Sequence, residues 1–391
     1  MKPPVLRLTL ILGALAAFAP MSIDMYLPGL PALARSFDTD AGAVELTLSA
    51  FFVGLVCGQL VYGPLTDRFG RRRPLAAGIL IYVLASVGCA LASNLSALIG
   101  LRFLQAMGGC AGLVISRAVV RDLFDAQESA RMFSLIMLVM GAAPILAPLA
   151  GGALLVGFGW RSIFWALALF GLLVLAASLA WMPETRRGRG ASLGVRATLR
   201  VYATMLADRR FLGYALAGGF AQAGMFAYIT GSPAVFIELN GVPPQHYGWL
   251  FGSNALGLIA ASQVNRRLLA SHAARRVLWR ANQINAACGA ALLATAISGA
   301  GGFVGLLVPL FGYVTSLGFI GPNATALAMA EQGRRAGSAA ALLGTLQFAL
   351  AALVSASLGL LNEASAVPMA FAVALCGLLA LIAHRALGRP G

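Results

Sequence analysis

Charge is scarce in this sequence, and lysine is almost absent. Only 10% of the 391 residues are charged, and Lys2 is the single lysine. Without a second lysine the chain cannot form the GxxxxGK[ST] loop that holds nucleotide phosphates. The sequence therefore excludes a built-in ATP-binding cassette. We predict no cofactor, so any energy that the protein uses must come from an ion gradient.

Cysteine is also rare, and its spacing forms no pattern. All five cysteines lie inside apolar runs, with no CxxC pair and no metal-like spacing: Cys57, Cys89, Cys110, Cys288 and Cys376. Cysteine in such surroundings usually acts as a small packing residue. We therefore predict neither a disulfide framework nor a metal site.

Apolar side chains are what the sequence has in excess. Hydrophobic residues make up 60% of the chain, which is more than the core of a soluble domain of this length can bury. A membrane-spanning helix needs about 20 mostly apolar residues, and such runs recur along the chain. We predict an all-α integral membrane protein with twelve spans, at residues 8–33, 44–66, 75–93, 96–117, 132–157, 162–182, 211–237, 247–265, 277–298, 301–324, 336–360 and 366–384.

The placement of arginine predicts the orientation of these spans. With both termini in the cytoplasm, 25 of the 28 lysine and arginine residues fall in inner segments, and only Arg35 and Arg161 fall in outer ones. Cytoplasmic loops carry such an excess. We therefore predict a multi-pass protein of a bacterial inner membrane, with both termini cytoplasmic. The net charge of +15 is then a topology signal and not a nucleic-acid-binding surface.

The longest inner segment separates six spans from six. It is rich in Arg, Gly and Ser, as flexible linkers often are. We predict an N-terminal six-helix bundle, a cytoplasmic linker and a C-terminal six-helix bundle, at residues 1–183, 184–210 and 211–391 respectively.

A weak internal repeat indicates that the two bundles share one plan. Pro28 of the first span matches Pro233 of the seventh, as expected for pseudo-symmetric halves. The residue that matches Asp24 is Ile229. Only the first half therefore carries an acid within its first span.

Several stretches together resemble one transporter family. GPLTDRFGRRRPL (63–75) resembles the loop signature of the major facilitator superfamily, and LRFLQAMGG (101–109) resembles its fourth-helix motif. APILAPLAGG (143–152) resembles the fifth-helix motif of its antiporters. SIDMYLPGLP (22–31) and the stretch 232–257 resemble the bicyclomycin and chloramphenicol resistance (Bcr/CflA) exporters. The resemblance implies the major facilitator fold, with two pseudo-symmetric six-helix bundles.

The loop signature lies at the inner end of the second span. The resemblance implies a conformational latch there, with the candidates Gly63, Asp67, Arg68, Gly70, Arg71, Arg117 and Arg121. Asp67 can accept from the amides at a helix N-terminus, or pair with Arg117 or Arg121, and so hold one state of the bundle. The alternative interpretation is a solvated basic turn.

The fifth span carries paired prolines and glycines: Pro144, Pro148, Gly151 and Gly152. We predict that they bend this helix and let it pack closely against its neighbours. Ala143 and Ala147 stand where the antiporter motif normally has glycine, so the residues stay small but the match is weaker. An ordinary proline-containing membrane helix is the alternative.

Asp24 and Arg102 are the two charges inside spans, clear of the loop ends. A charge in mid-membrane costs about 2.5–3.5 kcal/mol and is usually functional. The family resemblance implies that both line one cavity, within reach of each other. Desolvation disfavours a carboxylate and a nearby guanidinium favours it, so Asp24 is predicted to carry the proton. A purely structural ion pair, or a hydrated Asp24, are the alternatives.

Polar and aromatic residues inside the spans are candidates for the substrate cavity. They are Tyr26, Phe51, Gln105, Phe220, Gln222, Phe226, Tyr228, Asn254, Asn323 and Gln347. Aromatic walls with a few amides suit a neutral, amphipathic drug. Plain helix packing is the alternative for each of them.

The sequence thus predicts proton-coupled efflux of a small antibiotic-like molecule by alternating access. Its expected partners are a drug, protons and the lipid bilayer, and the protein is expected to be a monomer. Proton-coupled uptake or export of a small metabolite is the alternative within transport. A membrane enzyme would call for clustered His, Asp or Glu near one membrane face, and the acids here are scattered.

Overall fold

Helices make up almost all of the computed structural model. The structure describes residues 5–124, 126–185, 195–330, 332, 336–361 and 365–387, and no strand occurs among them. The chain divides into two compact units, with residues 1–40, 46–194 and 244–248 in the first and residues 41–45, 195–243 and 249–391 in the second.

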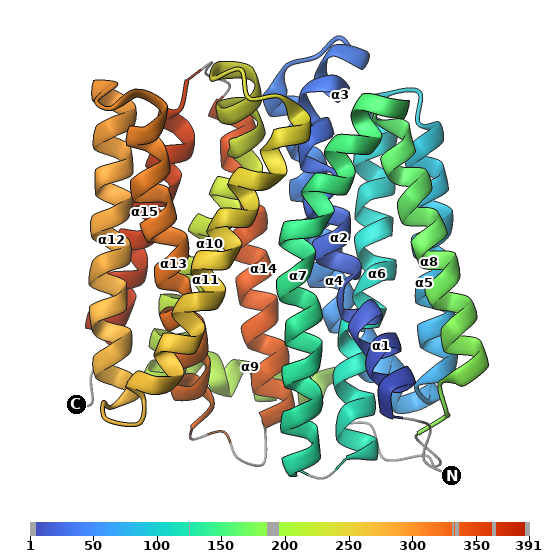
Figure 1. Cartoon of the computed structure of the whole chain (residues 1–391). Coiled ribbons are helices and arrows are strands. Elements are labelled where there is room, and N and C mark those ends of the chain that lie inside the picture. The colour runs from blue at the N-terminus through green and yellow to red at the C-terminus, as the bar shows by residue number, and fades with distance from the viewer. Residues whose placement is uncertain are drawn as a thin grey trace. The chain divides into compact units, whose positions relative to one another are not determined.

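The first unit is built from the helices of the N-terminal half (Figure 1). In chain order they are α1 (Val5–Ala16), α2 (Phe18–Asp24), the 3₁₀ turn η1 (Leu27–Gly29), α3 (Leu30–Ser36), α4 (Ala41–Phe69), α5 (Arg72–Leu91), α6 (Leu95–Leu123), α7 (Ala126–Phe158) and α8 (Arg161–Trp181). Helix α5 packs against both α6 and α8, and α1 and α2 pack against α6 and α7.

The second unit follows the same order of long helices. It comprises α9 (Val195–Ala207), α10 (Arg209–Pro233), the π-helical turn η2 (Ala234–Leu239), α11 (Pro244–Leu268), α12 (Ala274–Ser298), α13 (Gly302–Met329), α14 (Ala336–Leu361) and α15 (Val367–Leu387). Helix α10 packs against α13, α14 and α15, and α12 packs against α13 and α15. The segment expected to be a flexible linker thus contains the helix α9, whereas residues 186–194 lie outside the described part.

The first span of each half is irregular near its matching proline. In the first unit the helix breaks between α2 and α3, around Pro28. In the second unit α10 ends at Pro233 and continues as the π-helical turn η2. Proline cannot donate a helical hydrogen bond, so the same residue type interrupts both helices at the place that the repeat indicates.

Eight helices among the described residues are long and apolar enough to cross a membrane. Counting the bent pair Arg7–Ala16 and Phe18–Ser36, with 47° between its parts, as one span makes nine. The other three predicted spans correspond to α7, which holds the shorter apolar helix Ala142–Phe158, and to α11 and α12. Helices α11 and α12 are long enough, but they carry several amides and arginines.

Glycine allows the helices of the first unit to approach closely. A Cβ on Gly54 of α4 would overlap the carbonyl oxygen of Phe103 in α6, and one on Gly112 of α6 would overlap the carbonyl oxygen of Leu15 in α1. In the same helix, Gly100 has no neighbour within 4 Å of its Cβ position. Small residues at helix contacts are a main source of packing in membranes.

Replacing Gly112 with alanine is expected to lower the free energy of unfolding by about 1–3 kcal/mol, because the new methyl group must push α1 away from α6. The matched variant Gly100→Ala makes the same change on the same helix, in open space, and gains up to about 1 kcal/mol of helix propensity. Thermal unfolding of both purified variants in one detergent measures the difference. Equal stability of the two variants would contradict this packing.

Candidate functional site

The break in the first span leaves backbone groups without their helical partners. The amide of Tyr26 bonds the carbonyl of Ile23 at 3.2 Å, in a 3₁₀ pattern, and so does not reach the carbonyl of Ser22. Pro28 has no N–H to offer the carbonyl of Asp24. The chain thus presents a free carbonyl at Ser22, two residues before the buried acid.

Arg102 of α6 donates the hydrogen bond that this carbonyl lacks. Its guanidinium donates to the carbonyl oxygen of Ser22 at 3.1 Å and to Oε1 of Gln105 at 2.6 Å. Tyr26 and Phe51 place their rings 4.4 and 4.3 Å from the guanidinium carbon, and Phe164 places its ring at 5.8 Å. Arg102 is fully buried, and no carboxylate bonds it among the described residues.

The two hydrogen-bond acceptors and three aromatic rings around the Arg102 guanidinium form a cage, and their combined contacts are strong enough to hold a cation in this position. A desolvated cation–π contact contributes about 2 kcal/mol, and a hydrogen bond to a charged group contributes about 1.5–3 kcal/mol. Two close rings and two hydrogen bonds therefore offset the roughly 2.5–3.5 kcal/mol that a mid-membrane arginine costs. The Nε atom of Arg102 is buried without a partner, so the compensation is incomplete.

A chain of polar side chains from α2, α5 and α6 supports the cage. The Nε2 group of Gln105 donates to Oγ of Ser86 at 2.8 Å, and Ser86 donates to the carbonyl of Tyr82 at 2.7 Å. The hydroxyl of Tyr82 lies 2.8 Å from that of Ser22. Each member is buried. The position of Arg102 is therefore fixed by three helices at once.

Asp24 ends α2 next to this cage and is only 4% exposed. The expected pair with Arg102 is not formed, because the guanidinium is engaged by Ser22 and Gln105. Among the residues that the structure describes, the Asp24 carboxyl makes no hydrogen bond and no ion pair. The site thus combines a caged cation with a nearby buried acid that has no partner.

Three of the predicted cavity residues belong to the cage. Tyr26, Phe51 and Gln105 all contact Arg102. The hydroxyl of Tyr26 also lies 2.8 Å from that of Thr47. All three are nearly inaccessible, so in this state they line the arginine and not an open surface.

In the second unit, Tyr228 and Asn254 meet directly. The amide of Asn254 donates to the hydroxyl of Tyr228 at 3.0 Å, and the Tyr228 ring stacks on Phe251 at 5.5 Å. Phe236 lies 6.2 Å from the same ring. These residues form an aromatic cluster with one amide, on α10, η2 and α11.

Asn323 lies away from that cluster. Its amide donates to Oδ1 of Asn265 at 2.7 Å, and Asn265 lies eleven residues, or about 16 Å, along α11 from Asn254. The pair clasps α11 to α13. The remaining candidates are Phe226, which packs on Phe348 at 6.0 Å, and the half-buried Phe220, Gln222 and Gln347.

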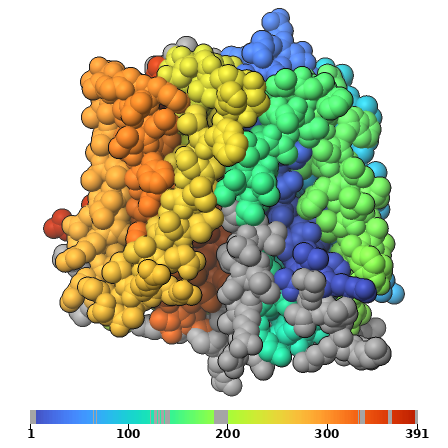
Figure 2. Space-filling view, viewed as in Figure 1, coloured from blue at the N-terminus to red at the C-terminus, as the bar shows by residue number. Residues whose placement is uncertain are grey.

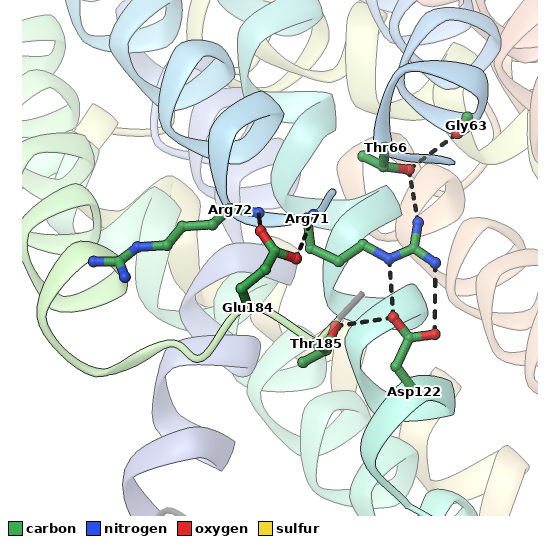
Figure 3. A network of polar contacts seen from close by, with 7 residues as sticks. All are labelled: Gly63, Thr66, Arg71, Arg72, Asp122, Glu184 and Thr185. Atoms are coloured by element: carbon green, nitrogen blue, oxygen red, sulfur yellow. Dashed lines mark hydrogen bonds and ion pairs between the residues drawn. The ribbon is translucent and has the colours of Figure 1, made fainter. Parts of the chain in front are cut away.

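A second polar network surrounds Arg71 at the end of α4 (Figure 3). Gly70 adopts a φ of 81°, a left-handed conformation that glycine reaches without strain, and so turns the chain into α5. The Arg71 guanidinium then bonds Asp122 of α6 at 2.9 Å and Thr66 of α4 at 2.9 Å. Thr66 in turn donates to the carbonyl of Gly63 at 3.0 Å.

Glu184 closes the network from the segment after α8. Its two carboxylate oxygens accept from the backbone amides of Arg71 and Arg72, at 2.9 and 3.1 Å. These amides begin α5, where the helix dipole favours an anion. Thr185 also donates to Asp122 at 2.9 Å. Four helices or their ends are therefore joined at one point.

The sequence reasoning missed Thr66, Asp122, Glu184 and Thr185. Asp122 lies five residues beyond the predicted fourth span and Glu184 two residues beyond the sixth, and an acid near a span end opposite the arginine-rich turn was the available signal.

Of the predicted latch residues, Arg71 lies at the centre of this network, while Arg68 and Arg117 are exposed. The side chains of Asp67 and Arg121 lie outside those that the structure describes.

The fifth-helix motif packs against the broken span. Helix α7 continues through Pro144 and Pro148, and both Gly151 and Gly152 are buried. A Cβ on Gly151 would overlap the carbonyl oxygen of Met25, which directly follows Asp24. Only glycine lets α7 come this close to the site.

Known proteins resemble this chain over nearly its whole length. It is 40% identical over 381 residues to the uncharacterized MFS-type transporter YdgK of Bacillus subtilis, covering 96% of this chain and 94% of the relative. It is 31% identical over 376 residues to the bicyclomycin resistance protein homolog of Haemophilus influenzae, covering 96% and 94%. It is 31% identical over 359 residues to the chloramphenicol resistance protein of Pseudomonas aeruginosa, covering 90% and 82%.

The fold also matches that of solved transporters. The crystal structure of a D-xylose-proton symporter superposes with a TM-score of 0.79 at 15% identity, covering 98% of each chain. Residues 12–356 match the Major Facilitator Superfamily. This chain is therefore a multi-pass membrane transporter that belongs to the major facilitator superfamily.

Proposed function

We propose that this protein exports small, mostly uncharged antibiotic-like molecules across a bacterial inner membrane in exchange for protons. Its full-length similarity to relatives named for bicyclomycin and chloramphenicol resistance carries this proposal. The two units would expose the substrate site to either side in turn. Both termini would face the cytoplasm, and a monomer in the bilayer would suffice.

Asp24 carries the proton in this mechanism. Asp24 is buried and its carboxyl makes no hydrogen bond or ion pair with any residue that the structure describes, so the charged form is costly in this state while the neutral form is not. When the site opens to water, hydration lowers the free energy of the charged carboxylate, so the proton leaves. One proton crossing 100 mV supplies about 2.3 kcal/mol, and no cofactor is needed.

Arg102 acts as a positioning residue. It bonds the carbonyl of Ser22 and so holds the broken helix that carries Asp24. Its cage of rings keeps the cation away from substrate. A change in the helix break would therefore alter the surroundings of Asp24 and of Arg102 together, which couples protonation to the conformation of the first unit.

The Arg71 network acts as a latch. It joins α4, α5, α6 and the end of α8 through one partly buried ion pair and two amide contacts. Such a set of contacts has two discrete conditions, formed and broken, and can bias one conformation of the unit.

Replacing Asp24 with asparagine is expected to reduce proton-driven transport to the level of empty vesicles, because the amide cannot release a proton. The measurement is accumulation of labelled chloramphenicol and bicyclomycin by inside-out vesicles on acidification of their lumen. Accumulation by the unaltered protein also establishes export, since an importer would not load such vesicles.

Asp38→Asn is the matched control, because Asp38 lies in the outer connection, where its φ of 48° suits asparagine equally well. This variant is expected to transport normally. Full proton-driven efflux by Asp24→Asn would exclude Asp24 as the proton carrier.

Replacing Arg102 with lysine keeps the charge but removes the planar fork that reaches Ser22 and Gln105 together. We expect strongly reduced transport, and a free energy of unfolding lower by about 1–3 kcal/mol because buried acceptors lose their donor. Vesicle transport and thermal unfolding report the two effects. A lysine variant with unaltered transport would show that only the charge matters.

Replacing Arg71 with glutamine breaks the partly buried ion pair with Asp122, and leaving the carboxylate without this donor costs about 1–3 kcal/mol. The exposed Arg73, in the first turn of α5, provides the control Arg73→Gln. We expect Arg71→Gln alone to speed exposure of the inner side, measured by labelling of single cysteines placed along α4. Equal labelling rates in both variants would contradict a latch.

A further inference from the structure

Four arginines lie together at one end of two neighbouring helices of the second unit. Arg275, Arg276 and Arg280 occupy the first turns of α12, and Arg385 lies in the last turn of α15. All four are exposed, and none forms an ion pair within the described residues. No aspartate or glutamate occurs in residues 239–330 or 364–391. The charge of this group, the seam arginines, is thus uncompensated by the helices that carry it.

The buried His384 of α15 contacts α12 and so fixes the end of α15, with Arg385, beside the beginning of α12. The Nδ1 atom of His384 lies 3.1 Å from the amide nitrogen of Asn282, and its ring lies 5.3 Å from that of Trp279 and 5.7 Å from that of Tyr214. Arg385 follows His384, and Arg280 lies between Trp279 and Asn282. The two helix ends are therefore fixed side by side, as Figure 1 shows.

An apolar surface continues from the seam arginines along both helices. On α15 it is a ridge at helical spacing, formed by Phe371, Leu375, Leu378 and Ile382, all exposed. From Phe371 to Ile382 the ridge rises by eleven residue steps, or about 16 Å. This is close to half of the roughly 30 Å hydrocarbon thickness, so the ridge matches one leaflet.

The neighbouring face of α12 carries short side chains. Between the exposed Ile284 and Ile297, its exposed positions are mostly alanine: Ala287, Ala290, Ala291 and Ala294. The helices touch closely, because a Cβ on Gly289 would lie 3.0 Å from Ala374 and one on Gly377 would lie 3.2 Å from Ala286. We infer that this low face and the ridge of α15 leave a shallow trough between them, along the helix α12 that forms the left edge of Figure 2.

We propose that an anionic glycerophospholipid binds along this α12–α15 seam, with its phosphate on the seam arginines and an acyl chain in the trough. A basic cluster at the end of membrane helices attracts anionic headgroups. A soluble anion would use the arginines but not the leaflet-long apolar trough. A zwitterionic lipid would fill the trough but leave the cluster uncompensated.

The test is a titration of the full-length protein in detergent with phosphatidylglycerol, and separately with phosphatidylcholine, read by native mass spectrometry. Each arginine near an anionic group contributes roughly fivefold to binding. We therefore expect Arg280→Gln/Arg385→Gln to weaken phosphatidylglycerol binding about 30-fold, and the triple variant that adds Arg275→Gln about 150-fold. Phosphatidylcholine binding should not change in either variant.

The matched control is Arg73→Gln/Arg200→Gln/Arg209→Gln, which removes the same charge from exposed positions elsewhere. It should bind phosphatidylglycerol as the unaltered protein does, and thermal unfolding verifies that all variants are folded. Equal loss in the control would mean diffuse attraction and would overturn the proposal. So would unchanged binding in the triple seam variant, or displacement of the lipid by glycerol 3-phosphate at comparable concentration.

Discussion

The hydrogen bond from Arg102 to the carbonyl of Ser22 is the contact on which the first unit depends. A membrane helix cannot leave a carbonyl unsatisfied in hydrocarbon without a cost of several kcal/mol. The break around Pro28 creates such a carbonyl, and a guanidinium from α6 satisfies it. The rings of Tyr26, Phe51 and Phe164 then stabilise the cation that this solution brings into the membrane.

In this arrangement Arg102 stabilises the broken helix while Asp24 is free to gain or lose a proton, whereas an Asp24–Arg102 ion pair would have tied the two functions together. Arg102 is inaccessible and bonds the backbone, whereas Asp24 has no donor among the described residues, so its protonation can respond to its surroundings. The Arg71 network applies the same physics at the end of α4. There the carboxylate of Glu184 accepts from two backbone amides at the start of α5 that the helix leaves without a partner.

The second unit has the same sequence of helices but uses neutral amides for its buried contacts. Asn265 bonds Asn323, Asn254 bonds Tyr228, and Asn285 donates to Ser316 at 2.9 Å. Amides can join helices without the desolvation cost of ions. The pseudo-symmetric halves therefore differ in chemistry: the buried acid and the caged cation lie in the first, and the second supplies an uncharged aromatic cluster.

The sequence by itself determined the class of fold and singled out Asp24, Arg102 and Arg71 as candidates, because apolar length, arginine bias and isolated charges are local properties of a chain. It could not determine which groups those charges meet. The partner of Arg102 is a carbonyl freed by a helix break, and those of Arg71 are Asp122 and Thr66, on two other helices. Only the tertiary structure decided these pairings, since they depend on how closely glycine-lined helices approach and on which backbone groups their ends leave unsatisfied.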